Sequence, residues 1–132
     1  MLADVVDDEA KRCVVAAFSN MAMCSLKLQR PADAVAETDA ILDRLDPSNI
    51  KAIFRKGTAL LQLEKYEEAR EQFRKGLKTE NVADADAKKF KAEIAKINKI
   101  VETLERKRFE ESHRGVSEES TGIAFLQKGA FF

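Results

Sequence analysis

The chain has 132 residues, of which 45% are hydrophobic and 35% charged, a balance usual for a soluble helical protein rather than a disordered one. Its 23 basic and 23 acidic side chains cancel, which argues against a general nucleic-acid binder, since such proteins carry a basic excess. No apolar run approaches the roughly 18 residues of a membrane helix, and the first residues lack the basic flank of a signal peptide. We therefore predict a cytoplasmic protein that binds neither nucleic acid nor membrane.

The first predicted helix runs from about Asp4 to Gln29. Its apolar positions recur at spacings of three and four, which places them on one broad face. These positions are Val14, Phe18, Met21, Ala22, Ser25, Leu26 and Leu28. We expect this face to be buried, and Cys24 to pack as a small apolar group with its thiol reduced.

A second helix is predicted to begin at Pro31 and to extend to Leu45, because proline is well tolerated in a first helical turn. Pro47 predicts the next turn, since proline disfavours helical backbone at the residue before it. Ser48 or Asn49 can then cap a third helix.

The third helix is predicted over 50–63 and the fourth over 66–79. Gly57 and Ala69 are small where these two helices must approach each other closely. Larger side chains surround the small ones, namely Ile53, Leu60, Leu61, Tyr66, Phe73 and Leu77. The two helices are therefore expected to form a hairpin.

A longer fifth helix is predicted from about Ala83 to Glu111, because apolar residues step by four, three, four and three from Phe90 to Leu104. We expect it to cap the open end of the stack. The helix is rich in lysine and arginine. That pattern fits either a solvated outer face or a calmodulin target, and the sequence leaves both open.

Residues 112–132 are predicted to form a flexible tail, because polar residues and glycine predominate in its first half. The end of this tail is apolar, with Ile123, Ala124, Phe125, Leu126, Phe131 and Phe132. Two interpretations of that end stay open. It is either a disordered terminus or a segment that docks into a groove of this molecule or of a neighbour.

The chain repeats itself at a spacing of 35 residues. Ala22, Leu26, Leu28, Ala34 and Leu42 return as Gly57, Leu61, Leu63, Ala69 and Leu77. Two units, about 14–47 and 48–81, are thus built to one plan, and the helix over 83–111 follows them. We predict an all-α fold of two stacked hairpins and a long capping helix over residues 1–111.

This pattern resembles the tetratricopeptide repeat, a helix-turn-helix unit of about 34 residues with small side chains at its eighth and twentieth positions. Ala22 and Gly57 fall at the eighth position, and Ala34 and Ala69 fall at the twentieth. The second unit is the better match, because the first is one residue longer and departs from the usual residue types at Pro31, Thr38 and Ile41. The resemblance implies a right-handed α-solenoid.

Residues 16–28 and 46–57 more narrowly resemble the second and third repeats of large FKBP-type immunophilins. That resemblance implies a co-chaperone in which an FKBP-type peptidyl-prolyl cis-trans isomerase domain is joined to three repeats and a long final helix. Neither the isomerase domain nor the first repeat is among these residues. We therefore expect a part of a longer protein that is not itself an enzyme.

In that family the groove binds the acidic C-terminus of 90-kDa-class or 70-kDa-class heat-shock chaperones, ending in Glu-Glu-Val-Asp, through a two-carboxylate clamp. The resemblance implies that Asn20, Lys51 and Arg55 belong to this clamp. Lys51 and Arg55 are four residues apart on one helix face, and the guanidinium can bind a carboxylate with two parallel hydrogen bonds. Asn20 precedes Arg55 by one repeat and can donate its amide to the same anion. The clamp residues of the first repeat have no counterpart.

Catalytic or metal chemistry has little support in the sequence. The two cysteines and the single histidine, His113, form no metal-ligand set, and no Gly-rich phosphate loop is present. We predict no catalytic residue, metal or cofactor. Two further predictions concern binding. The stack could be a scaffold that binds another folded protein through its apolar concave groove. The first helix could also expose a face with Val5, Val6 and Val15 that supports self-association.

Overall fold

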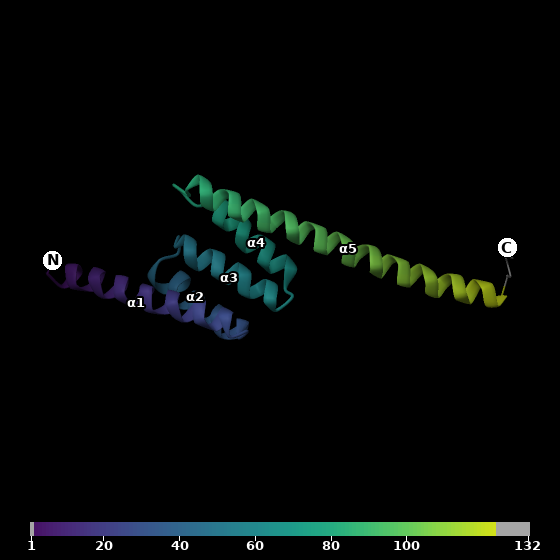
Figure 1. The fold of residues 1–132 in the computed structure, drawn as a ribbon, viewed down its shortest axis with the longest axis horizontal. Coiled ribbons are helices and arrows are strands. Elements are labelled where there is room, and N and C mark those ends of the chain that lie inside the picture. Colours follow the sequence, from purple (N-terminus) through teal and green to yellow (C-terminus); the bar gives the residue numbers. More distant parts are fainter. Residues whose placement is uncertain (1, 124–132) are drawn as a thin grey trace. The chain divides into compact units, whose positions relative to one another are not determined.

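The computed structural model describes residues 2–123, together with the side chains of residues 7–113. The helices, in chain order, are α1 (Leu2–Lys27), α2 (Pro31–Ala40), η1 (Ile41–Leu45), α3 (Ile50–Gln62), α4 (Tyr66–Leu77) and α5 (Asp84–Ile123). Figure 1 labels the five α-helices. No strand occurs within the described range, so the all-α prediction is confirmed. The chain divides after Ile97 into two compact units, and α5 begins in the first and continues into the second.

The first unit is a stack of two helical hairpins, α1 with α2 and α3 with α4, followed by the start of α5 (Figure 1). Helix α2 also packs against α3, which joins the hairpins, and α1 contacts α3 as well. The buried apolar core takes residues from every helix of this unit: Ala22, Ala34, Ile41, Leu42, Ala52, Ile53, Ala59, Leu60, Ala69, Phe73, Phe90 and Ile97. Of the repeated positions, Ala22, Ala34, Leu42, Gly57 and Ala69 are buried as predicted, whereas Leu28 is exposed.

Helices α1 and α3 end in the same way, one repeat apart. Gln29 and Glu64 have φ angles of 60° and 61°, in the left-handed region that glycine prefers at helix ends. After α3, Lys65 N–H donates to the Leu60 carbonyl at 2.9 Å and Glu64 N–H donates to the Leu61 carbonyl at 2.9 Å. This is the Schellman arrangement, which satisfies the last carbonyls of a helix and turns the chain sharply.

Replacing Glu64 with glycine is expected to raise stability by about 0.5 to 1 kcal/mol, because a side chain with positive φ is strained and glycine is not. Glu71 on α4 is a matched control, since it is also an exposed glutamate but lies inside a helix. Glu71→Gly should lower stability by about 1 kcal/mol. Urea unfolding followed by circular dichroism measures both. Equal destabilisation by the two changes would contradict the idea that the positive φ angle strains Glu64.

Small residues of the second hairpin are covered by aromatic rings. A Cβ atom added to Gly57 would lie 2.5 Å from Phe73 Cε1, and one added to Gly76 would lie 2.7 Å from Phe90 Cε1. The rings of Phe54, Phe73 and Phe90 form a cluster, with centroids 5.5 to 6.1 Å apart in tilted arrangements. Gly57 therefore faces a ring of the next helix, and the two glycines let α3, α4 and the first turns of α5 approach closely.

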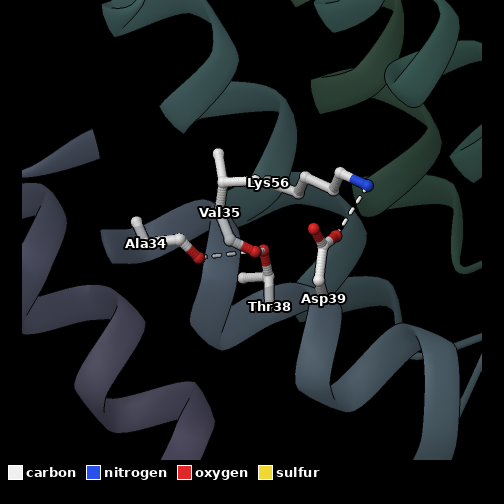
Figure 2. A network of polar contacts seen from close by, with 5 residues as sticks. All are labelled: Ala34, Val35, Thr38, Asp39 and Lys56. Atoms are coloured by element: carbon white, nitrogen blue, oxygen red, sulfur yellow. Dashed lines mark hydrogen bonds and ion pairs between the residues drawn. The ribbon is translucent and has the colours of Figure 1, made fainter. Parts of the chain in front are cut away.

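Polar contacts also join the hairpins, as Figure 2 shows. Lys56 Nζ on α3 lies 2.7 Å from Asp39 Oδ1 on α2. Beside this ion pair the buried Thr38 donates its hydroxyl to the carbonyls of Ala34 and Val35 at 2.9 and 3.0 Å. Because its hydroxyl is satisfied inside its own helix, Thr38 can be fully buried at this position.

The predicted apolar face of α1 is only partly buried. Ala22 and Ser25 are buried, but Met21 is 47% exposed and Leu28 is 65% exposed. Cys24 is exposed as well, so the prediction that it packs as a small apolar group is wrong. Helix α1 is the first helix of the stack, and in the described structure only α2, η1 and α3 lie against it. Within the described part of the chain, the side of α1 that carries Met21 and Leu28 is exposed.

Two helix ends differ from the predicted ones. The second helix was expected to be regular up to Leu45, but its last five residues form the π-helix η1, closed by a hydrogen bond of 2.7 Å from Asp46 N–H to the Ile41 carbonyl. A π turn holds one more residue than an α turn, and the first unit is one residue longer than the family's usual length. Helix α5 continues to Ile123, beyond the predicted end at Glu111. Residues 124–132 lie outside the described part of the chain. The division into a repeat domain that ends at residue 111 and a tail that begins at residue 112 stays a prediction.

In the second unit, α5 carries a local ring contact. The centroids of the Phe109 and His113 rings are 3.8 Å apart, and His113 Nδ1 lies 3.1 Å from the Phe109 carbonyl. The two residues are four apart, so this contact forms on one face of the helix and requires no other element.

Candidate functional site

Helix α3 carries the two predicted basic site residues on adjacent turns. Asn49 caps this helix, since its side-chain oxygen accepts a hydrogen bond of 2.9 Å from Ala52 N–H. This cap fixes the first turn, from which Lys51 projects, and Arg55 follows four residues later. Both residues line a groove of about 360 Å³ in the first unit. The full lining is Met23, Ile50, Lys51, Phe54, Arg55, Asp86, Lys89 and Phe90. The groove is thus lined by three cationic side chains, one carboxylate and four apolar side chains.

Arg55 is held against α1 by neutral oxygens. Its Nη1 donates to the carbonyl of Ser19 at 2.6 Å and also to the Ser19 hydroxyl. Among the side chains of residues 7–113, no carboxylate lies within ion-pair distance of this guanidinium. The Nε and Nη2 groups keep their N–H donors for a ligand. One edge of the guanidinium is therefore fixed by the fold, and the other has the two parallel donors that match a carboxylate.

Asn20 is an exposed residue of α1 that directly follows Ser19. It lies four residues after Ala16 and three before Met23, and both of these neighbours line hollows that also contain Lys51. Asn20 thus shares a strip of α1 with groove residues, because positions three and four apart are neighbours on a helix. The structure gives no contact that joins Asn20 to Lys51 or Arg55. The three-residue clamp therefore stays a prediction.

A second hollow, of about 530 Å³, lies between α1 and the start of α3. Lys51 lines it as well as the first groove, so this lysine stands between the two. Lys11 and Arg12 of α1 add two more cations, and Asp8 and Asp46 add two carboxylates. The sequence reasoning did not single out Lys11 or Arg12.

Lys89 and Phe90 also line the groove, although the sequence placed them only in a capping helix. The signal that could have found them is the 35-residue spacing applied once more. Asn20, Arg55 and Phe90 are 35 apart in turn, and Lys89 follows Phe54 by the same number. The start of α5 therefore repeats the role of α1 and α3 in lining the groove, as well as covering Gly76.

Comparison with known proteins gives three informative similarities. FK506-binding protein 59 of Drosophila melanogaster is 35% identical over 74 residues, which are 56% of this chain and 17% of that protein. Peptidyl-prolyl cis-trans isomerase FKBP4 of Homo sapiens is 28% identical over 121 residues, which are 86% of this chain and 26% of that protein. The solved structure of the Hsp90 co-chaperone Cns1 from Saccharomyces cerevisiae superimposes with a TM-score of 0.76 at 22% identity, covering 86% of this chain and 35% of that one.

The chain is similar in sequence to parts of FKBP-type proteins and similar in fold to the Hsp90 co-chaperone Cns1. The resemblance and the fold predicted from the sequence are thereby confirmed, although no protein-family model matches the chain. The chain spans between 17% and 26% of the length of these two curated relatives. Its described residues form helical hairpins and a long helix, not an isomerase domain.

In the described part of the chain, none of the helices is both long enough and apolar enough to cross a membrane. The same part also holds no cluster of three or more histidine, cysteine, aspartate or glutamate side chains placed to bind a metal ion.

Proposed function

We propose that this chain is a chaperone-binding module of an immunophilin-like co-chaperone, and that its groove binds an acidic peptide terminus of the Glu-Glu-Val-Asp type. The observation that carries the proposal is the pair Lys51 and Arg55 on one face of α3, in a groove with three cations and one carboxylate. The similarity to an Hsp90 co-chaperone and to FKBP-type proteins supports a heat-shock chaperone as the partner.

Arg55 would bind the terminal carboxylate through its free Nε and Nη2 edge. Because Ser19 already holds the other edge, the guanidinium loses little conformational freedom when the ligand binds. Lys51 would add a point charge on the same face, and Asn20 would donate its amide from α1. Lys11 and Arg12, in the neighbouring hollow, would attract the acidic residues that precede the terminus.

Titration calorimetry with a synthetic peptide ending in Met-Glu-Glu-Val-Asp tests this proposal. We expect saturable binding that weakens as salt is raised, because the screening length falls from ~10 Å at 0.1 M to ~3 Å at 1 M. A peptide with the same sequence and a C-terminal amide should bind at least about tenfold more weakly, since it lacks the carboxylate charge. Equal binding of the two peptides would contradict the clamp.

The second candidate is a scaffold that binds another folded protein through the groove. Its support is the apolar part of the groove lining, which consists of Met23, Ile50, Phe54 and Phe90. Insensitivity to salt and to loss of the terminal carboxylate would favour the scaffold over the clamp. Calmodulin binding by the basic face of α5 and a cytoplasmic location remain proposals of the sequence.

A further inference from the structure

Met23 lies in the wall of the peptide groove and is open to solvent. It lines the groove together with Arg55, Phe54 and Phe90, and it is 37% exposed. A thioether is apolar and packs well against aromatic rings, but it can be oxidised to a polar sulfoxide. The groove therefore contains an oxidisable sulfur beside its proposed anion-binding group.

Met23 is one helical turn away from the residue that holds Arg55. Ser19 accepts the hydrogen bonds of Arg55 Nη1, and Met23 follows Ser19 by four residues on the same face of α1. Side chains of a helix lean toward its N-terminus, so the Met23 thioether extends over the turn that carries Ser19. This direction brings the sulfur toward the guanidinium, whose Nε and Nη2 donors are the ones proposed to bind the ligand.

A two-electron oxidant such as hydrogen peroxide converts the Met23 thioether into a sulfoxide. One peroxide oxygen is transferred to sulfur, the O–O bond breaks as the S–O bond forms, and the other oxygen leaves as water. Sulfur is oxidised by two electrons, the peroxide is reduced by two, and no bond of the protein breaks. The product has an oxygen that accepts hydrogen bonds, whereas the thioether is only a weak acceptor.

We infer that Met23 is an oxidative modification site that controls ligand binding in the groove, an inference that rests on the proposed function. The sulfoxide oxygen accepts a hydrogen bond from the free edge of Arg55 and so competes with the ligand carboxylate for the same donors. Oxidation also makes an apolar part of the groove polar and weakens its contact with Phe54 and Phe90. Because methionine sulfoxide reductases reverse the reaction, the groove can regain its affinity.

Met21 is a matched control within the same helix. It is 47% exposed, so peroxide reaches it at least as easily as Met23, yet it lines neither the groove nor the neighbouring hollow. Cys13 and Cys24 are exposed and react with peroxide as well. The parent chain for the experiment therefore carries Cys13→Ser and Cys24→Ser, which leaves methionine as the readily oxidised residue type.

Calorimetry with the peptide ending in Met-Glu-Glu-Val-Asp, before and after peroxide treatment of the parent chain, tests the inference. Peroxide is removed before the peptide is added, and mass spectrometry gives the oxidised fraction at each methionine. Oxidation should weaken binding about three- to tenfold, and sulfoxide reductases should restore it. Met23→Leu, a swap of similar volume, should keep its affinity after peroxide, whereas Met21→Leu should lose affinity as the parent chain does.

The peptide with a C-terminal amide separates competition for Arg55 from a general loss of apolar contact. It offers the guanidinium no terminal carboxylate, so oxidation should weaken its binding less than that of the free acid, and an equal loss would overturn the competition. Unchanged affinity with Met23 fully oxidised, or the same loss in Met23→Leu, would overturn the inference as a whole. Absence of binding by the unoxidised chain would instead reject the proposed function, and this inference with it. Circular dichroism checks that the oxidised chain keeps its helices.

Discussion

Replacing Arg55 with alanine is expected to weaken binding of the acidic peptide about ten- to 150-fold, a loss of about 1.5 to 3 kcal/mol. The reason is that this guanidinium is the one groove cation that is fixed by the fold, through Ser19, and still has two parallel donors for a carboxylate. Calorimetry with the same peptide measures the effect. Arg55→Lys should recover only a part of the loss, because an ammonium has charge but no fork of donors.

Two controls separate the ligand contact from stability. Arg74→Ala removes an exposed arginine of α4 that lines neither hollow, and it should leave binding unchanged. Ser19→Ala removes one of the two acceptors that hold Arg55, so a loss of only a few-fold is expected there. Peptide binding by Arg55→Ala at the level of the unmodified chain would remove Arg55 from the site.

Replacing Phe90 with alanine is expected to lower the free energy of unfolding by about 3 to 5 kcal/mol, the usual cost of emptying a buried ring site. Phe90 is 0% exposed, covers Gly76 and completes the cluster with Phe54 and Phe73. Because Gly76 has no side chain, nothing on that side of the ring can move in to fill the space. Urea unfolding followed by circular dichroism measures the change.

Phe109 is the matched control for this substitution, since it lies in the same helix but is 60% exposed. Phe109→Ala should cost well under about 1 kcal/mol. Gly76→Ala should be destabilising although alanine favours helix, because its methyl group would meet the ring of Phe90. A stabilising effect of Gly76→Ala would contradict the close packing of α4 against the start of α5.

The fold could be predicted from the sequence wherever the 35-residue repeat applied. The pairs Ala22 with Gly57 and Ala34 with Ala69 are buried as expected, because small residues at repeated positions report close helix packing. Periodicity alone failed on α1. It indicates which residues share a face, but it does not show whether a neighbour covers that face. Met21, Cys24 and Leu28 are exposed for this reason.

The site could be predicted in part. Lys51 and Arg55 share a groove, as their spacing of four residues required. The anchor of Arg55 on Ser19 could not be predicted, because it joins residues 36 apart through a backbone carbonyl that carries no signal in the sequence. Lys89 was missed because α5 was interpreted as a cap, whereas its first turns continue the repeat.

The π turn η1 bears on how such a stack tolerates a change in length. One residue inserted into a regular α-helix rotates everything that follows by about 100°, which would turn the next cationic face away from its neighbours. Here the extra residue is accommodated in one widened turn, Ile41–Leu45. Arg55 still follows Asn20 by one 35-residue repeat. Insertions at the ends of the second helices are thus a route by which hairpins of unequal length can keep their binding surfaces aligned during evolution.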